Sequence, residues 1–246
     1  MGHPAISRSS PARLFLAWGV HLFTASGAVL AVMALLAIGV GDFSRAALLM
    51  LLALAIDSVD GTLARAVGVS EVLPDIDGRR LDDIVDYLNY VIVPVAFMAA
   101  AGLILSWGWL IPPVLASAYG FSQHDAKTED DFFLGWPSYW NVLALYLWLL
   151  ALSPEVGTLW VVGCTVAVFV PLKYVYASRI KQRLLRRTAT LGGLAWALVL
   201  GVAILLPDLA RSLRLVEISL IYPAYYVVLS IWLGDWKRGW RQEPAG

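Results

Sequence analysis

The sequence predicts an all-α integral membrane protein, a single bundle of about eight transmembrane helices. Of its 246 residues, 60% are hydrophobic, whereas a soluble domain is usually about 45–50% apolar. The mean hydropathy is +0.74, and the apolar residues gather in long runs that lack the alternation of membrane barrel strands. Because backbone polar groups in lipid must pair within the chain, helices are the expected elements.

Eight apolar stretches are candidates for spanning helices, which need about 20 residues each. They cover residues 15–40, 43–64, 80–101, 106–122, 138–153, 156–178, 189–206 and 215–233. The first stretch is longer than the apolar part of a signal peptide, so we expect it to be retained as a span. We therefore treat residues 1–246 as one membrane-embedded domain.

The distribution of basic residues predicts the orientation in the membrane. With a cytoplasmic N-terminus, the inside segments hold fourteen Lys and Arg residues and the outside segments hold three, which agrees with the positive-inside rule. Both termini then lie in the cytoplasm. The basic stretch Arg179–Arg187 is expected to anchor the protein beside anionic headgroups, and attraction of an anionic lipid substrate is the alternative.

Four carboxylates are spaced so that they can meet at the cytoplasmic ends of the second and third spans. Asp57 and Asp60 are three residues apart, and Asp82 and Asp86 are four apart, so each pair shares a helix face. Clustered carboxylates repel one another unless cations neutralise them. All-oxygen ligands suit Mg²⁺ or Mn²⁺, and two such ions suit chemistry on a phosphoryl group.

The residues beside these carboxylates suit a phosphate-containing ligand. Gly61 allows a bulky group to approach the backbone, and Ala64, one turn further, is also small. Arg65 can bind a phosphate with its planar guanidinium group or serve only as a cytoplasmic positive charge. Gly78 can permit the turn into the third span and close contact with a nucleotide. Asp83 points about 100° away from its neighbour in the metal set, so we exclude it.

Small residues in the first span predict a close contact between helices. Ser26, Gly27 and Ala28 leave room for a neighbouring backbone, and Gly192 and Gly193 in the seventh span are expected to do the same. For His21 we expect a role in packing or a position at the membrane interface.

The complete pattern, D-x2-D-G-x2-A-R…G-x3-D-x3-D, resembles the signature of the CDP-alcohol phosphotransferase family. Twelve residues separate the Arg from the second Gly, where the family usually has eight. This longer gap resembles the one in the bacterial branch of the family that uses choline, and the segment 119–141 resembles the corresponding segment of that branch. The likeness extends over nearly the whole chain.

The resemblance implies roles for the residues and a reaction. Asp57, Asp60 and Asp82 would bind Mn²⁺ or Mg²⁺, and Asp86, beside them, would also be the general base. The nucleotide and phosphate would contact Gly61, Ala64, Arg65 and Gly78. The implied reaction joins choline to the phosphatidyl group of CDP-diacylglycerol and releases CMP, in a bacterial inner membrane. A homodimer is compatible with the family, although no helix in the sequence identifies an interface.

Aromatic residues near the cytoplasmic side are the candidates for binding choline, because aromatic faces and nearby carboxylates hold a quaternary ammonium group best. The aromatic candidates are Tyr87, Tyr90, Tyr119, Trp136, Tyr139 and Trp140, and the candidate carboxylate is Asp125. An interfacial aromatic belt is the alternative explanation. The segment 122–138 holds four acidic residues and one lysine, which favours a cationic acceptor over inositol phosphate or glycerol phosphate; serine is a further alternative.

Transport of a divalent cation is the alternative from a different functional class. Transport sites tend to lie near the bilayer midplane, whereas these carboxylates lie at one face with an arginine among them. The net charge is zero, so no basic field indicates a nucleic-acid partner. The sequence therefore favours an enzyme that acts among membrane lipids.

Overall fold

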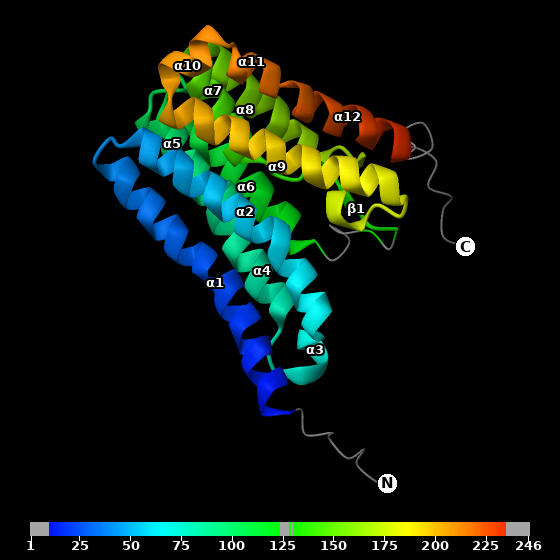
Figure 1. Ribbon diagram of the computed structural model, residues 1–246. Helices are drawn as coiled ribbons and strands as arrows, with labels where there is room; N and C mark the ends of the chain where they lie inside the picture. The colour runs from blue at the N-terminus through cyan, green and yellow to red at the C-terminus, as the bar shows by residue number, and fades with distance from the viewer. Residues whose placement is uncertain (1–9, 124–127, 129, 235–246) are drawn as a thin grey trace.

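The computed structural model describes residues 10–123, 128 and 130–234. Over this part of the chain it is a helical bundle with one small two-stranded sheet (Figure 1). Five described helical segments are long and apolar enough to cross a membrane. They are Pro11–Gly39 (α1), Phe43–Val67 (α2), Gly78–Ala100 (α4, η1 and α5), Arg183–Leu205 (α9) and Leu215–Leu233 (α11 and α12). The prediction of an all-α integral membrane protein is confirmed.

The third span changes its helix type near the predicted metal site. It begins as the α-helix α4 (Gly78–Asp86), continues as the π-helix η1 (Tyr87–Ile92), and ends as α5 (Val93–Ala100). π-Helical turns are rare in proteins, and those that occur are often found at functional sites. In the last span, α11 (Leu215–Ser219) and α12 (Ile221–Leu233) follow the short helix α10 (Pro207–Ser212).

Three of the eight predicted spans are helices shorter than a membrane crossing requires. They are α6 (Ile111–Ser122, preceded by the 3₁₀ turn η2, Trp107–Leu110), α7 (Trp140–Leu149) and α8 (Pro154–Phe169). At about 1.5 Å per residue they extend roughly 15–24 Å, less than the hydrocarbon core of about 30 Å. Helices occur in all eight stretches, but eight crossings remain a prediction.

The end of the sixth predicted span, 156–178, is wrong. Helix α8 stops at Phe169 because Val170, which precedes Pro171, takes an extended conformation, as residues before proline usually do. The chain then forms strand β2 (Lys173–Val175) and the 3₁₀ turn η3 (Ala177–Arg179). Pro171 was a signal in the sequence for this helix end.

The two strands join distant segments at the end of the bundle where α12 ends and α9 begins (Figure 1). Strand β1 (Phe132–Leu134) pairs antiparallel with β2, with Phe133 opposite Tyr174. Two salt bridges connect the same segments, from Lys173 to Asp130 at 2.6 Å and from Arg179 to Asp131 at 2.8 Å. This ribbon fixes the segment after α6 to the segment before α9.

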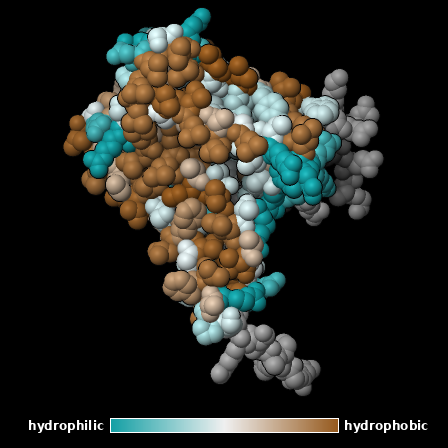
Figure 2. Space-filling model, viewed as in Figure 1, coloured by the Kyte–Doolittle hydropathy of each residue, from teal (hydrophilic) through white to brown (hydrophobic). Residues whose placement is uncertain are grey.

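The surface agrees with a membrane environment. Figure 2 shows apolar residues over most of the visible face, with hydrophilic residues gathered near its edges, at the top, left, right and bottom. Large side chains such as Leu22, Trp160, Leu198 and Trp232 are more than half exposed. Apolar patches of this extent are rare on soluble monomers, but they are the expected surface in contact with lipid tails.

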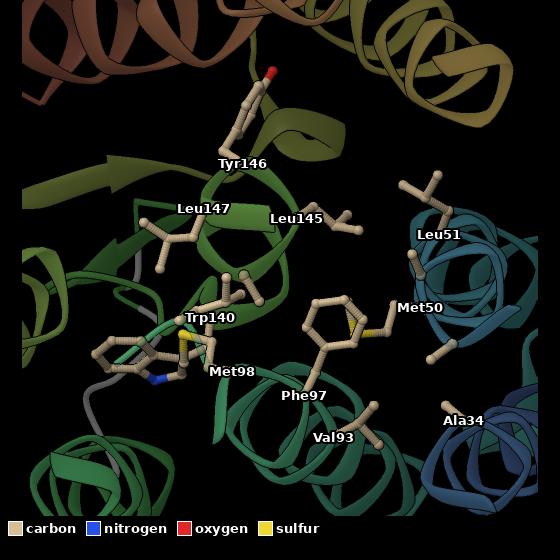
Figure 3. Close-up of a cluster of buried hydrophobic side chains, with 14 of the residues drawn as sticks. Ala34, Met50, Leu51, Val93, Phe97, Met98, Trp140, Leu145, Tyr146 and Leu147 are labelled. Atoms are coloured by element: carbon tan, nitrogen blue, oxygen red, sulfur yellow. The ribbon is translucent and has the colours of Figure 1, made fainter. Parts of the chain in front are cut away.

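The core holds α2, α5 and α7 together behind the carboxylates. Phe97 of α5 points toward Met50 of α2 (Figure 3), and its ring lies 5.5 Å from Phe43 and 5.7 Å from Trp148 in edge-to-face contacts. Such contacts add about 0.5–1.5 kcal/mol each beyond their buried area. The packing fixes the end of the third span against the second.

The long connection between Arg65 and Gly78 packs on the first span. Helix α2 ends at Val67, and the next residue, Gly68, has a φ of +69°, which favours glycine. The short helix α3 (Val69–Val72) follows. Val69 and Val72 are buried with Ala17 and Val20 of α1 in a small apolar cluster. The extra residues of this gap are therefore part of the packed structure.

Candidate metal and nucleotide site

Three of the four predicted aspartates come together. Asp57 of α2 and Asp82 and Asp86 of α4 each offer a carboxylate oxygen, and these oxygens lie within 4.8 Å of one another. All three residues are half-buried, so water screens their mutual repulsion less than at an open surface. A cation would relieve this repulsion, and the oxygen ligands fit Mn²⁺ or Mg²⁺.

Asp60 lies on the same pocket but faces the first span. It is 5% exposed, and one of its oxygens accepts a hydrogen bond of 2.9 Å from Thr24 Oγ1 of α1. Asp60 is outside the group of three oxygens, although it lines the pocket together with Asp57 and Asp86. Asp83 does not belong to the group, in agreement with its exclusion on the basis of helix geometry.

The pocket beside the carboxylates is small and is formed by three neighbouring helices, α1, α2 and the third span, which lie side by side in Figure 1. Its lining residues are Thr24, Gly27, Ala53, Ile56, Asp57, Asp60, Val85, Asp86, Asn89 and Tyr90. The first span contributes to this wall, although the aspartate pattern in the sequence contains no residue from it.

The first and third spans meet at Gly27. A Cβ atom added to Gly27 would lie 2.6 Å from Val85 Cγ1, too close for two carbon atoms in van der Waals contact. Asn89 Nδ2 donates hydrogen bonds of 3.0 Å to the carbonyl oxygens of Gly27 and Val85. The predicted close packing around Gly27 is confirmed, and a buried amide group reinforces it.

Of the predicted nucleotide-binding residues, Gly61, Ala64 and Arg65 lie along the last turns of α2. The exposed Arg65 folds back along this turn, and its Nη2 donates a hydrogen bond of 3.1 Å to Thr62 Oγ1. Its Nη1 lies 3.3 Å from the point where a Cβ of Gly61 would be. The guanidinium group is thus held beside the glycine, where it can reach a phosphate that approaches the backbone.

Gly78, the fourth predicted nucleotide-binding residue, begins α4 and lies against His21 of the first span. The His21 Cε1 atom is 3.1 Å from the position of an added Cβ on Gly78. His21 is buried, which agrees with a packing role, but its Nε2 has no hydrogen-bond partner among the described residues. A buried polar atom without a partner costs about 1–3 kcal/mol, and no feature of the sequence indicated this cost.

Three tyrosines extend from the carboxylates toward the ribbon, and we call them the tyrosine row: Tyr90, Tyr139 and Tyr226. The Tyr90 hydroxyl donates a hydrogen bond of 2.6 Å to Asp57 Oδ2. Ring centroids are 5.9 Å apart between Tyr90 and Tyr139, and 5.8 Å apart between Tyr139 and Tyr226. Tyr226 of α12 was missed by sequence reasoning, because only the packing of distant helices brings it here.

The other predicted choline-binding residues lie in different surroundings. Tyr87 donates its hydroxyl to the Val114 carbonyl oxygen at 3.0 Å. Tyr119 is exposed and its ring lies 5.5 Å from Phe169. Trp136 is half-buried against Trp140, which is fully buried and donates its indole N–H to Ser117 Oγ. Asp125 lies outside the described residues.

The acidic character of segment 122–138 is partly compensated in the fold. Asp130 and Asp131 pair with Lys173 and Arg179 across the ribbon. Burial acts to raise the pKa of Asp130, but hydrogen bonds from Lys173 and Thr128 outweigh it and lower the pKa below its ordinary value. The hydrogen bond to Asp131 raises the pKa of Arg179. Two of the four acidic residues therefore give weaker support to a cationic acceptor than the sequence indicated.

Comparison with known proteins places these features in a family. No protein-family model matches the chain. The chain is 46% identical over 170 residues to a phosphatidylcholine synthase of Legionella pneumophila, covering 68% of this chain and 67% of the relative. It is 35% identical over 224 residues to the phosphatidylcholine synthase of Borreliella burgdorferi, covering 89% and 95%. A Pseudomonas aeruginosa phosphatidylcholine synthase is 38% identical over 179 residues, covering 68% and 71%. With this degree of identity and coverage, the chain belongs to the phosphatidylcholine synthase family.

Proposed function

We propose that this chain transfers the phosphatidyl group of CDP-diacylglycerol to choline and releases CMP. The observation that carries the proposal is the meeting of three carboxylate oxygens within 4.8 Å beside a pocket between three helices. Membership in the phosphatidylcholine synthase family supports the product. The chain's bacterial relatives support a place in a bacterial inner membrane, and the positive-inside rule supports cytoplasmic termini.

The carboxylates suit a divalent centre of one or two ions. Asp57, Asp82 and Asp86 would hold Mn²⁺ or Mg²⁺, with Asp60 completing the pocket on the side of α1. The bound cations would neutralise the charge that develops on the diphosphate in the transition state. Gly61 and Ala64 leave space for the phosphates, and Arg65 donates to a phosphate oxygen. Gly78 allows close contact at the start of α4.

Asp86 is proposed as the general base. Its carboxylate accepts the proton of the choline hydroxyl while the choline oxygen forms a bond to the phosphorus that carries diacylglycerol. The bond from this phosphorus to the bridging oxygen of the diphosphate breaks, and its electron pair leaves with CMP. Protonated Asp86 then releases its proton to water. A site at the membrane boundary suits this reaction, because one substrate is a lipid and the other is water-soluble.

The choline ammonium group is proposed to bind against the tyrosine row. A quaternary ammonium group has no hydrogen to donate, so aromatic faces attract it through their electron density, by about 0.5–2 kcal/mol per ring. Tyr139, half-buried between Tyr90 and Tyr226, is the central residue of this surface. Tyr90, which contacts Tyr139 and donates a hydrogen bond to Asp57, links this surface to the carboxylates.

The test is phosphatidyl transfer by the purified protein in detergent with CDP-diacylglycerol, Mn²⁺ and labelled choline. Labelled phosphatidylcholine and an equal amount of CMP are expected, with no lipid product from labelled serine or glycerol phosphate. Product from one of those acceptors, and none from choline, would replace the proposed acceptor.

Asp86→Asn tests the base, and Asp83→Asn is its matched control. Both residues are half-buried aspartates of α4, but Asp83 lies outside the group of three oxygens. Loss of a general base typically lowers the rate about 10²–10⁴-fold, so we expect this loss in Asp86→Asn and far smaller effects in the control. Turnover near the wild-type rate in Asp86→Asn would remove Asp86 from the mechanism.

A further inference from the structure

Tyr90 occupies a position between the carboxylates and the proposed choline surface. It lies in η1, four residues after Asp86, and is 5% exposed. Its hydroxyl donates to Asp57 Oδ2 at 2.6 Å, within the range of about 2.5–2.7 Å that is usual for a hydroxyl bonded to a carboxylate. Its ring contacts Tyr139. Tyr90 therefore contacts both a proposed metal ligand, Asp57, and a proposed choline-binding residue, Tyr139.

The hydrogen bond to Asp57 restricts the orientation of that carboxylate. Without a partner, a carboxylate can rotate about its Cβ–Cγ bond, because terminal torsions of this kind have broad minima. A donor fixed in a packed helix sets the plane of the carboxylate. Groups that orient metal ligands in this way typically change metal affinity by about 10–100-fold when they are removed.

The π-helix places this donor. In η1 the Val93 N–H bonds to the Leu88 carbonyl oxygen, five residues earlier, so this turn is wider than an α-helical turn. Asn89, in the same turn, bonds to Gly27 of the first span. The turn is thus held against α1 on one side while Tyr90 reaches Asp57 of α2 on another.

We propose that Tyr90 is a positioning residue with two separable effects. Its hydroxyl orients Asp57 for the divalent cation, and its ring supports Tyr139 at the choline surface. The second effect rests on the proposed function, whereas the first requires only that the carboxylates bind a cation.

Tyr90→Phe removes the hydroxyl and keeps the ring. Tyr87→Phe is the matched control, because Tyr87 lies in the same π-helix and its hydroxyl donates to the Val114 carbonyl oxygen, not to a carboxylate. The probe is Mn²⁺ alone, titrated into the full-length protein in detergent without substrates and followed by electron paramagnetic resonance. We expect Mn²⁺ binding about 10–100-fold weaker in Tyr90→Phe and unchanged in Tyr87→Phe.

Two further variants test how the effect is transmitted. In the Asp57→Asn background, Tyr90→Phe should weaken Mn²⁺ binding no further, because residues that act through one group are not additive. An additive loss would overturn the proposal. Tyr90→Leu, which also removes the ring, should raise the KM for choline in turnover assays, whereas Tyr90→Phe should lower kcat at saturating lipid and leave this KM close to that of the wild type.

The outcomes separate the positioning role from the proposed reaction. Wild-type affinity for Mn²⁺ in a folded Tyr90→Phe protein overturns the positioning role, whatever the enzyme makes. Failure of the wild-type protein to bind Mn²⁺ overturns the metal centre and this role together. Weakened Mn²⁺ binding in Tyr90→Phe, combined with a wild-type protein that transfers no phosphatidyl group to choline, would support the positioning role and refute the proposed function.

Discussion

Replacement of Gly27 by alanine tests the contact between the first and third spans. The added Cβ would lie 2.6 Å from Val85 Cγ1, so α1 and α4 must move apart by about 1 Å to restore an ordinary carbon–carbon contact of about 3.5–4.0 Å. Forced expansion of a packed interior costs about 1–3 kcal/mol. Alanine also favours a helix over glycine by about 1 kcal/mol, which partly offsets this cost.

Gly19→Ala, on the same helix, is the control that separates the steric cost of Gly27→Ala from the helix preference of alanine. An added Cβ on Gly19 meets no atom within 4 Å, so this variant gains the helix preference without the collision. The preference cancels in the comparison, which leaves Gly27→Ala about 1–3 kcal/mol less stable than Gly19→Ala. For a chain of this size, that difference corresponds to about 2–12 °C in Tm.

Thermal unfolding of both variants in the same detergent, followed by tryptophan fluorescence, measures the difference. Activity should fall in Gly27→Ala and persist in Gly19→Ala, because only the first displaces the helix that carries Thr24 and receives Asn89. Equal Tm values together with equal activity would show that the two helices do not approach this closely.

The remaining predictions concern the tyrosine row, the proposed metal centre and the ribbon. Tyr139→Leu should raise the KM for choline several-fold more than the KM for CDP-diacylglycerol, since each lost aromatic contact is worth about 0.5–2 kcal/mol; equal changes in steady-state assays would indicate an interfacial belt. Chelation of divalent cations should abolish transfer, and added Mn²⁺ or Mg²⁺ should restore it, so activity that survives exhaustive chelation would contradict the metal centre. Hydrogen bonds from Lys173 and Thr128 lower the pKa of Asp130 despite its partial burial. The ionised carboxylate should therefore stabilise the ribbon at pH values above the ordinary carboxylate pKa of about 4. This contribution should be lost as the pH falls through the lower pKa that Asp130 has in the folded protein. Because the pair is half exposed, the contribution is under about 1 kcal/mol, and Tm measured from about pH 6 to about pH 3 should fall less steeply in Lys173→Met than in the wild type; identical slopes would contradict this linkage.

The aspartate cluster was predictable because its geometry is local. Residues three or four apart on a helix share a face, and the connection between α2 and α4 makes these two helices neighbours. Asp57, Asp82 and Asp86 follow from this geometry. The hydrogen bond from Thr24 to Asp60 could not be predicted in this way, because Thr24 belongs to a helix whose position depends on packing across the whole bundle.

The helix ends and the pairing of the two strands in the ribbon were harder to predict from the sequence. Apolar stretches identify residues that avoid water, but they do not show where a helix stops. At Pro171 a local rule was available, and it accounts for the end of α8. The pairing of Phe133 with Tyr174 joins segments far apart in the chain, and so does the contact of Tyr139 with Tyr226. Such pairings depend on the arrangement of all the helices between them.

Two of the predicted metal ligands accept hydrogen bonds from hydroxyl groups on two different helices. We therefore expect different regions of the fold to control Mn²⁺ binding and the KM for choline. Thr24 of α1 donates to Asp60, and Tyr90 of η1 donates to Asp57. Asn89 bonds α1 to η1 at Gly27, so this contact sets the distance between the two donors. A steric change at Gly27, which touches no aspartate, should therefore weaken Mn²⁺ binding as Tyr90→Phe does. Changes in the ribbon act on Tyr226, whose hydroxyl donates to the Val175 carbonyl oxygen, and should alter the KM for choline while Mn²⁺ binding stays unchanged.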